Sequence, residues 1–152
     1  MREHLRSDDE SLPGPAAIIR KPRATRSSGI PTARQRVGNL AEDAVAHLVE
    51  ARGFEILWRN LHLGHLEIDI VARKDDLVVM IEVRTRGPGA FEGPLASIVG
   101  KKKMRLLYAA DRLWSRHLKT MDGVERMRID VAGVTFANGE AQIDYIPGAI
   151  SK

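Results

Sequence analysis

The sequence predicts a single α/β domain built around a mixed β-sheet, preceded by a polar tail. Three features support this class. A helical apolar pattern comes first, two apolar runs around a charged turn follow, and a second helical pattern precedes two alternating segments. The length of 152 residues, with 43% hydrophobic and 29% charged residues, fits one ordinary globular domain.

The first 34 residues are predicted to form a disordered basic tail ahead of a folded domain at 35–152. They include "SLPGP" and "KPRATRSSGIP" and are poor in aromatic residues, so they cannot bury enough apolar area to offset the entropy of ordering. They hold seven Lys or Arg against four Asp or Glu, whereas the remainder holds 17 against 16. Most of the net charge of +4 therefore lies in the tail, which is either an arm that touches phosphates or a solvated segment without a specific role.

The segment "GNLAEDAVAHLVEARG", residues 38–53, is predicted to be the first helix. Asn39 is the expected N-cap, and Glu42 follows at the spacing of a capping box. The expected apolar stripe consists of Leu40, Ala44, Val45, Leu48 and Val49. Glu42 therefore has two interpretations: it points from the helix towards a functional site, or it is only the third residue of a helix cap.

Three strands are expected next. "FEILWRN" is the first, with Trp58 in the core rather than serving as a platform for nucleic-acid bases. Leu63 to Ala72 and Leu77 to Arg86 form the next two strands, with "RKDD" as the turn between them. Because this hairpin carries the longest apolar runs, it is expected near the middle of the sheet.

The remaining chain predicts a helix from Lys101 to His117 and two closing strands, "RMRIDVAGVTF" and "AQIDYIP", around "ANGE". Met104, Leu107, Tyr108 and Trp114 are the expected apolar side of this helix. The run Lys101–Lys103 at its start is either a clamp for phosphate or a solvated face.

Three acids interrupt the apolar hairpin: Glu67, Asp69 and Glu82. Because side chains alternate along a strand, Glu67 and Asp69 are expected on one face, and Glu82 on the face of Arg84. A two-residue turn at Asp75-Asp76 would place Asp69 opposite Glu82. A turn shifted by one residue would place Glu67 opposite Glu82. Both registers gather the acids on one face of neighbouring strands.

Facing carboxylates destabilise a sheet, and burying them without partners costs more, so a positive charge is expected among them. A divalent ion such as Mg²⁺ is one candidate, since it takes a few carboxylates and keeps waters for a phosphate substrate. An internal salt-bridge network with Arg84 or Arg86 is the other. The residues alone leave both possibilities open.

Composition favours a cytoplasmic protein without a membrane segment. Cys is absent, so disulfides and thiolate metal sites are excluded. The start "MREHLRSDDE" has early acids and no apolar core, unlike a secretory signal. Apolar runs such as "LVVMI" fall far short of the roughly 18 residues that a membrane span needs.

Several of these segments, in order from Val37 to Pro147, resemble the YraN family, a group of bacterial proteins with a restriction-endonuclease-like fold. They are "GNLAEDAVAHLVEARGFEILWRN", "LEIDIVARKDDLVVMIEVRTR", "KKKMRLLYAADRLW", "MRIDVAGV" and "IDYIPGAI". The chain is more distantly similar to archaeal Holliday-junction resolvases. The resemblance implies a nuclease that uses Mg²⁺ or Mn²⁺ and acts on DNA, with branched or repair intermediates as substrates and a homodimer as an expected assembly.

The resemblance also implies roles for individual residues. In the PD-(D/E)xK superfamily an Asp and a Glu bind Mg²⁺, which assigns Asp69 and Glu82 as metal ligands. Glu42 corresponds to the helix acid near the site, and Glu67 to the first acid of the family's Glu-Ile-Asp motif. Lys103 stands where a lysine recurs in the family.

Arg84 departs from the superfamily pattern, which has a lysine at this position. A lysine can lose its proton when its surroundings shift its pKa, whereas an arginine effectively cannot. Arg84 can still position a phosphate or stabilise developing charge, and Lys103 is the expected substitute for the motif lysine. Two rival functions stay open: a nucleic-acid-binding module without catalysis, and a protein-interaction domain suggested by the nearly neutral folded region.

Overall fold

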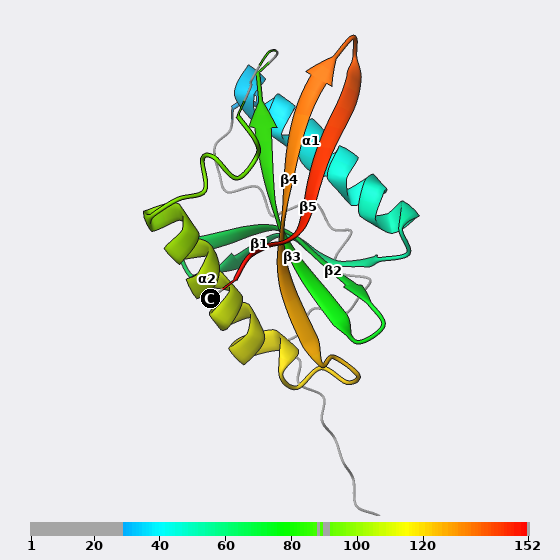
Figure 1. Cartoon of the computed structure of the whole chain (residues 1–152), viewed down its shortest axis with the longest axis vertical. Coiled ribbons are helices and arrows are strands. Elements are labelled where there is room, and N and C mark those ends of the chain that lie inside the picture. Colours follow the sequence, from blue (N-terminus) through cyan, green and yellow to red (C-terminus); the bar gives the residue numbers. More distant parts are fainter. Residues whose placement is uncertain (1–28, 88, 90–91, 152) are drawn as a thin grey trace, which may run out of the picture.

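A computed structural model describes residues 29–87, 89 and 92–151. The strands form one five-stranded sheet in the order β1-β2-β3-β4-β5, in which only β3 and β4 run parallel (Figure 1). The elements in chain order are α1 (Ala33–Ala51), β1 (Glu55–Leu63), β2 (Leu66–Lys74), β3 (Leu77–Arg86), α2 (Lys101–Leu113), the π-helical turn η2 (Trp114–Leu118), β4 (Arg126–Ala137) and β5 (Glu140–Ile150).

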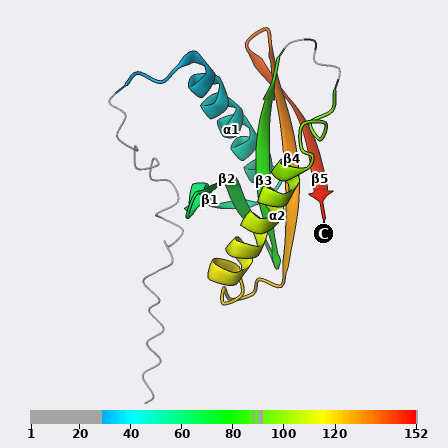
Figure 2. The same cartoon turned by 90° about the vertical axis from the view of Figure 1, so that its left-hand side faces the viewer.

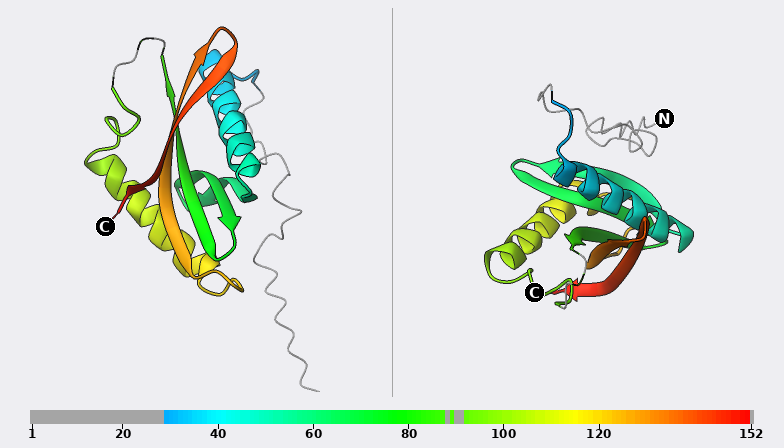
Figure 3. Two further views of the ribbon diagram at one scale, coloured as in Figure 1. Left: turned by 45° about the vertical axis from the view of Figure 1, so that its right-hand side comes forward. Right: turned by 90° about the horizontal axis from the view of Figure 1, so that it is seen from above.

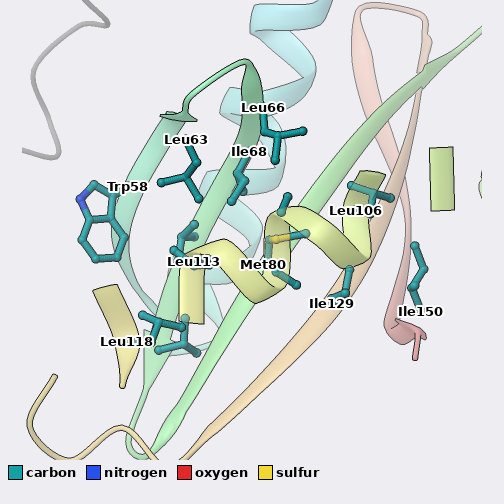
Figure 4. Packing of buried hydrophobic residues seen from close by; sticks show 14 of the residues in the cluster. Trp58, Leu63, Leu66, Ile68, Met80, Leu106, Leu113, Leu118, Ile129 and Ile150 are labelled. Carbon is teal, nitrogen blue, oxygen red and sulfur yellow. The ribbon is translucent and has the colours of Figure 1, made fainter. Parts of the chain in front are cut away.

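The sheet lies between α1 on one face and α2 on the other (Figures 2 and 3). Two hydrophobic clusters correspond to these faces. Val45 and Val49 of α1 pack with Ile81 of β3, whereas Leu106 and Leu113 of α2 pack in the larger cluster shown in Figure 4. This arrangement confirms the expected α/β architecture, a mixed central sheet flanked by helices.

Helix α1 begins earlier than the sequence pattern indicated. Thr32 is the N-cap, and it forms a reciprocal capping box with Gln35, with hydrogen bonds of 3.2 and 2.8 Å. The prediction of an N-cap at Asn39 was wrong, and Glu42 lies well inside the helix. The apolar face also differs, since Leu40 is 57% exposed and the buried residues are Ala41, Val45, Ala46 and Val49.

Most of the predicted tail lies outside the described residues, because the description starts at residue 29. Its disorder therefore stays a prediction. The last part of the expected tail, from the N-cap Thr32 to Arg34, instead forms the start of α1.

Helix α2 begins at Lys101 as expected, but its buried face was misjudged. The buried positions are Leu106, Ala109, Ala110 and Leu113, whereas the expected core residues Met104 and Tyr108 are 64% and 48% exposed. The helix is rotated about its axis relative to the predicted orientation. This rotation decides which lysine of its first turn faces the sheet.

The β2–β3 hairpin has the two-residue turn at Asp75-Asp76, because Lys74 pairs with Leu77. Of the two registers that the sequence left open, the structure has the one with the turn at Asp75-Asp76, and β2 begins at Leu66 rather than Leu63. Trp58 of β1 is 5% exposed and belongs to the core, as expected.

The closing β4–β5 hairpin turns at Asn138-Gly139, both of which have positive φ, and it forms the long upright pair of strands in Figure 1. No helix in the described part of the chain is long and apolar enough to cross a membrane.

Candidate active site

The acids meet where β2 and β3 separate. The ladder between these strands ends at Ile70 and Ile81. One residue further, the Oδ2 atom of Asp69 accepts a hydrogen bond of 2.8 Å from the backbone N–H of Val83. The Asp69 side chain thus accepts a hydrogen bond where the next backbone hydrogen bond between β2 and β3 would lie. This bond fixes the orientation of the Asp69 carboxylate.

An irregularity in β1 and β2 accompanies this opening. Asn60 has a positive φ of 48°, and the register between the two strands has no pair for Asn60 and Asp69. Ile68 and Ile70 pack in the clusters on different faces of the sheet. The strict alternation expected from the sequence is therefore interrupted at Asp69, and Glu67 and Asp69 do not simply share one face.

Asp69 carries a charge that its surroundings disfavour. Burial and then the negative charge of Glu82 raise the pKa of Asp69 to about 7, and the charges of Glu42 and Glu67 act in the same direction. The hydrogen bond from Val83 opposes this shift only partly. Among the described residues no cation pairs with Asp69, so the carboxylate sits in an electrostatic environment that would favour a bound cation.

Glu82, by contrast, has two cations beside it. It is 6% exposed, and its Oε1 atom lies 2.6 Å from Nζ of Lys102 and 3.6 Å from Nη1 of Arg84. The internal ion pair with Arg84 considered from the sequence is thus present, but the lysine of α2 is closer. These cations account for Glu82 and leave Asp69 uncompensated.

Glu42 approaches the acids from α1. Its side chain is 16% exposed and accepts a hydrogen bond of 2.9 Å from Nδ2 of Asn60. Burial raises the pKa of Glu42, while Asn60 and then Arg59 oppose the shift. Of the two interpretations of Glu42, the helix-cap role is excluded, and the residue faces the strands at the irregularity.

Glu67 lies at the rim of the cluster. Its side chain is 51% exposed and lies 4.0 Å from Nε2 of His62. Its negative charge nevertheless contributes to the raised pKa values of Asp69 and Glu42. The charges of the four acids therefore influence one another. The side chain of Glu67 is more exposed than those of Glu42 and Glu82.

Lys103 does not contact the acids. It is exposed and forms no ion pair with the described acidic residues, whereas its neighbour Lys102 touches Glu82. The expectation that Lys103 would be the lysine at the site is corrected to Lys102. The reason is the rotation of α2, which turns Lys102 rather than Lys103 towards the sheet.

The arrangement fits a divalent ion bound by two carboxylates. No three Asp, Glu or His side chains of the described residues converge closely enough to form a ready cage for a metal. Mg²⁺ does not need one, since it commonly binds through one or two carboxylates and completes its shell with water and substrate phosphate. Asp69 and Glu82 offer this ligand set, and the uncompensated charge of Asp69 favours a cation there.

A cavity adjoins the acids on the other side of Arg84. Nη2 of Arg84 donates a hydrogen bond of 3.1 Å to Oγ of Ser97. Beyond this contact lies a cavity of about 380 Å³ whose walls include Arg84, Arg86, Pro94 and Ser97. One guanidinium group therefore separates the acid cluster from the cavity.

Comparison with known proteins places the chain in a family. Residues 41–134 match the model of the "Uncharacterised protein family UPF0102". The chain is 45% identical over 138 residues to a UPF0102 protein of Sorangium cellulosum, covering 89% of this chain and 96% of that protein. The chain belongs to this family. A UPF0102 protein of Myxococcus xanthus is 37% identical over 120 residues, or 78% of this chain and 92% of that protein.

Membership confirms the resemblance to the YraN family, and the matched segment contains every acid of the site. Two solved structures are distantly similar. A repair endonuclease from Pyrococcus abyssi has a TM-score of 0.39 and 16% identity, covering 74% of this chain and 42% of that chain. Pyrococcus furiosus SfsA in complex with Ca²⁺ has a TM-score of 0.38 and 13% identity, covering 81% and 67%. Likenesses this distant assign no function, which must come from the site itself.

Sequence reasoning missed Asn60 and Ser97 of the candidate site, and it named Lys102 only as part of the basic run Lys101–Lys103. A signal existed for Lys102, which precedes the buried Leu106 by four residues and therefore lies on the same helix face. Asn is a residue type that tolerates positive φ, but nothing local in "WRN" indicates the irregularity. Ser97 lies in a connection whose course depends on packing against β4.

Proposed function

We propose that this protein is a metal-dependent nuclease that hydrolyses phosphodiester bonds in DNA, with branched or repair intermediates as the expected substrates. One observation carries the proposal: Asp69 lies beside Glu82 with a pKa raised to about 7 and without a cation of its own among the described residues. A purely structural ion-pair network would compensate both carboxylates. Strongly perturbed acids of this kind are typical of functional sites.

Asp69 and Glu82 would hold Mg²⁺ or Mn²⁺. The bound ion would supply positive charge to the phosphate and a more acidic water. The backbone N–H of Val83 holds one Asp69 oxygen in place, and the other oxygen would bind the ion. Glu42, whose pKa is raised by burial, is suited to orient the attacking water and to accept its proton.

Arg84 and Lys102 would divide the task of the motif lysine. The Arg84 guanidinium is 33% exposed and lies between Glu82 and Ser97, where it can donate to oxygens of the scissile phosphate. Lys102 can provide what an arginine cannot, a proton for the leaving sugar oxygen as its bond to phosphorus breaks. The attacking water would form the new bond to phosphorus from the opposite side.

A second candidate function is a DNA-binding module without catalysis. The observation in its favour is that Lys102 and Arg84 already lie against Glu82, so internal cations occupy one of the two proposed metal ligands. This function predicts salt-sensitive DNA binding together with no heat on titration with Mg²⁺.

Calorimetric titration with Mg²⁺ and Mn²⁺ separates the two candidates. The proposal expects binding heat for the wild type and its loss in Asp69→Asn. Asp122→Asn is the matched control, since Asp122 is an exposed aspartate in the connection between α2 and β4, and it should bind metal like the wild type. Cleavage of linear, nicked or four-way-junction DNA that survives Asp69→Asn would exclude this site.

Two adjacent lysines offer a second matched comparison. Lys102→Met is expected to lower the cleavage rate by about 10²-fold or more, the usual range for removing a proton-transfer group or a charge donor at a reacting centre. Lys103→Met should leave the rate within about twofold, because Lys103 is exposed and away from Glu82. Equal loss in both variants would assign the effect to general DNA affinity instead.

A further inference from the structure

We infer that the cavity beside Arg84 binds a backbone phosphate of the DNA strand, next to the scissile phosphate but outside the acid cluster. This inference rests on the proposed function, because it assumes that a DNA strand crosses the acids. It assigns to Arg86 and Ser97 a role in binding substrate, and it identifies the cavity as the place where the strand continues.

The cavity begins where the acid cluster ends. Arg84 reaches both, with Nη1 3.6 Å from Glu82 and Nη2 bonded to Ser97. Arg86 follows two residues later on the same side of β3 and lines the cavity. Its Cα atom is about 7 Å further along the strand, which is similar to the separation of successive phosphates in a nucleic-acid strand.

Arg86 is a half-buried cation with no acidic partner among the described residues. A guanidinium group in such a position has five donors that favour a phosphate or carboxylate. Arg84 contributes a second positive charge, and Ser97 a hydroxyl group, to the same walls. Glu92 is the opposing charge in the lining, but its side chain is exposed at the rim.

Packing against β4 gives the cavity a defined wall. Pro94 is buried against Gly133, which pairs with Arg84 in the β3–β4 ladder. A Cβ atom on Gly133 would lie 2.8 Å from Cβ of Pro94 and 3.5 Å from Cδ of Arg86. The glycine therefore lets the Pro94 segment close over the sheet and leaves room for the stem of Arg86.

The surroundings favour a polyanion over a small free phosphate compound. Ser97 precedes α2 by only a few residues, and the first turns of that helix, residues 101–105, carry four Lys or Arg and no acid. A strand held at Arg84 and Arg86 therefore lies beside the most basic element of the folded domain. Contacts with several successive phosphates make binding strong at low salt and steeply salt-dependent.

Fluorescence anisotropy with a labelled DNA duplex in EDTA tests the cavity without cleavage. Arg86→Gln is expected to weaken binding about tenfold and to lower the salt dependence by about one phosphate contact. The matched control is Arg116→Gln, an exposed arginine about 22 Å along the helix axis from Lys101, with an expected change below twofold. Equal affinities for the two variants, or a wild type that binds no DNA, would overturn the inference.

Gly133→Ala tests the shape of the cavity at unchanged charge. It should also weaken DNA binding, because the added methyl group displaces Pro94; a melting curve shows whether the variant is folded. If Gly133→Ala is folded and binds DNA like the wild type, the arginines act as surface charge and the cavity is not a built site. A nucleoside monophosphate that binds tightly and depends on Arg86, while DNA does not, would identify a small ligand and refute the DNA assignment.

The inference and the proposed function can fail separately. If the wild type binds DNA through Arg86 but cleaves no substrate with any divalent metal, the cavity stands and the nuclease fails. If Arg86→Gln binds and cleaves like the wild type, the nuclease stands and the cavity fails.

Discussion

Two carboxylate sites lie at the same level of the sheet but on opposite faces. In the β3–β4 ladder, Ile81 pairs with Asp130 and Glu82 pairs with Val131. Asp130 is 0% exposed and accepts four hydrogen bonds: 2.7 and 2.8 Å from the Arg128 guanidinium, 2.5 Å from the Tyr145 hydroxyl and 2.8 Å from the Gly148 N–H. Its charge is fully satisfied by the protein.

The site around Asp69 and Glu82 is built differently. Glu82 has its cations, but Asp69 has one backbone N–H and three negative neighbours. A buried acid that the fold itself satisfies has a structural role, because it closes a network that pins neighbouring strands. An acid without a compensating cation from the protein indicates a site that a cation from solution can complete.

The largest effect on stability is expected at the satisfied site. Asp130→Ala leaves the Arg128 charge, the Tyr145 hydroxyl and the Gly148 N–H without their acceptor, so it should lower the free energy of unfolding by about 3–5 kcal/mol. Urea denaturation measures the change. Since Asp130 lies on the face away from Glu82, the folded fraction should still bind Mg²⁺. A stable Asp130→Ala protein that has lost its metal binding would reverse the assignment of roles.

At the site around Asp69 and Glu82, by contrast, a substitution is expected to increase the free energy of unfolding. Asp69→Asn removes the charge that Glu82 disfavours while keeping the side-chain shape and the oxygen that accepts from Val83. A pKa raised from 3.8 to about 7 corresponds to an upper bound of about 4 kcal/mol, and partial solvation reduces the gain to about 1–3 kcal/mol. The measurement is urea denaturation at pH 7.5 in EDTA. Destabilisation by this substitution would show that Asp69 is a structural acid like Asp130.

A substitution at Tyr145 tests one of the four hydrogen bonds that Asp130 accepts. Tyr145→Phe removes the hydroxyl group that donates to Asp130 and should cost about 1.5–2 kcal/mol of stability, the lower part of the range for hydrogen bonds to charged groups. Tyr108→Phe is the natural control, because Tyr108 is 48% exposed on α2 and should change stability by less than about 0.5 kcal/mol. Equal effects of the two substitutions would argue against a strong bond at Asp130.

Much of the site around Asp69 and Glu82 could be predicted from the sequence. The charged turn limited the hairpin to two registers, and one of them, with Asp75-Asp76 in the turn, brings Asp69 next to Glu82 as the structure has it. The acids inside an apolar run already required a cation. The helix acid Glu42 was found as well, although its mistaken place in a capping box obscured its direction.

Other parts depend on contacts that no local pattern encodes. Thr32 and Gln35 match the capping-box spacing as well as Asn39 and Glu42 do, and the packing of the whole helix selects the earlier start. The irregularity at Asn60 arises from how β1 and β2 pair. Lys102 required the true rotation of α2, which the apolar residues Met104 and Tyr108 concealed because they are exposed.

The most diagnostic measurement is the change of stability with pH in EDTA. The folded-state pKa of Asp69 lies above its unfolded value of 3.8, so its contribution to stability is fully present below about pH 4 and is lost as pH rises through about 7. The burial that raises the pKa of Glu42 adds a change of the same sign. The free energy of unfolding should fall from pH 5 to pH 7, by at most about 1.4 kcal/mol per pH unit for one group.

The controls separate this loss from other titrations. The pKa of Asp76 is lowered by its hydrogen bond with Arg126, so its contribution is lost only as pH falls below about 4, outside the window. Asp69→Asn should flatten most of the decline. Because Mg²⁺ competes with the proton for the same carboxylates, saturating Mg²⁺ should flatten the decline in the wild type as well. A decline that Asp69→Asn removes but Mg²⁺ leaves unchanged would mean that the acids carry a proton, not a metal, and would favour the module without catalysis.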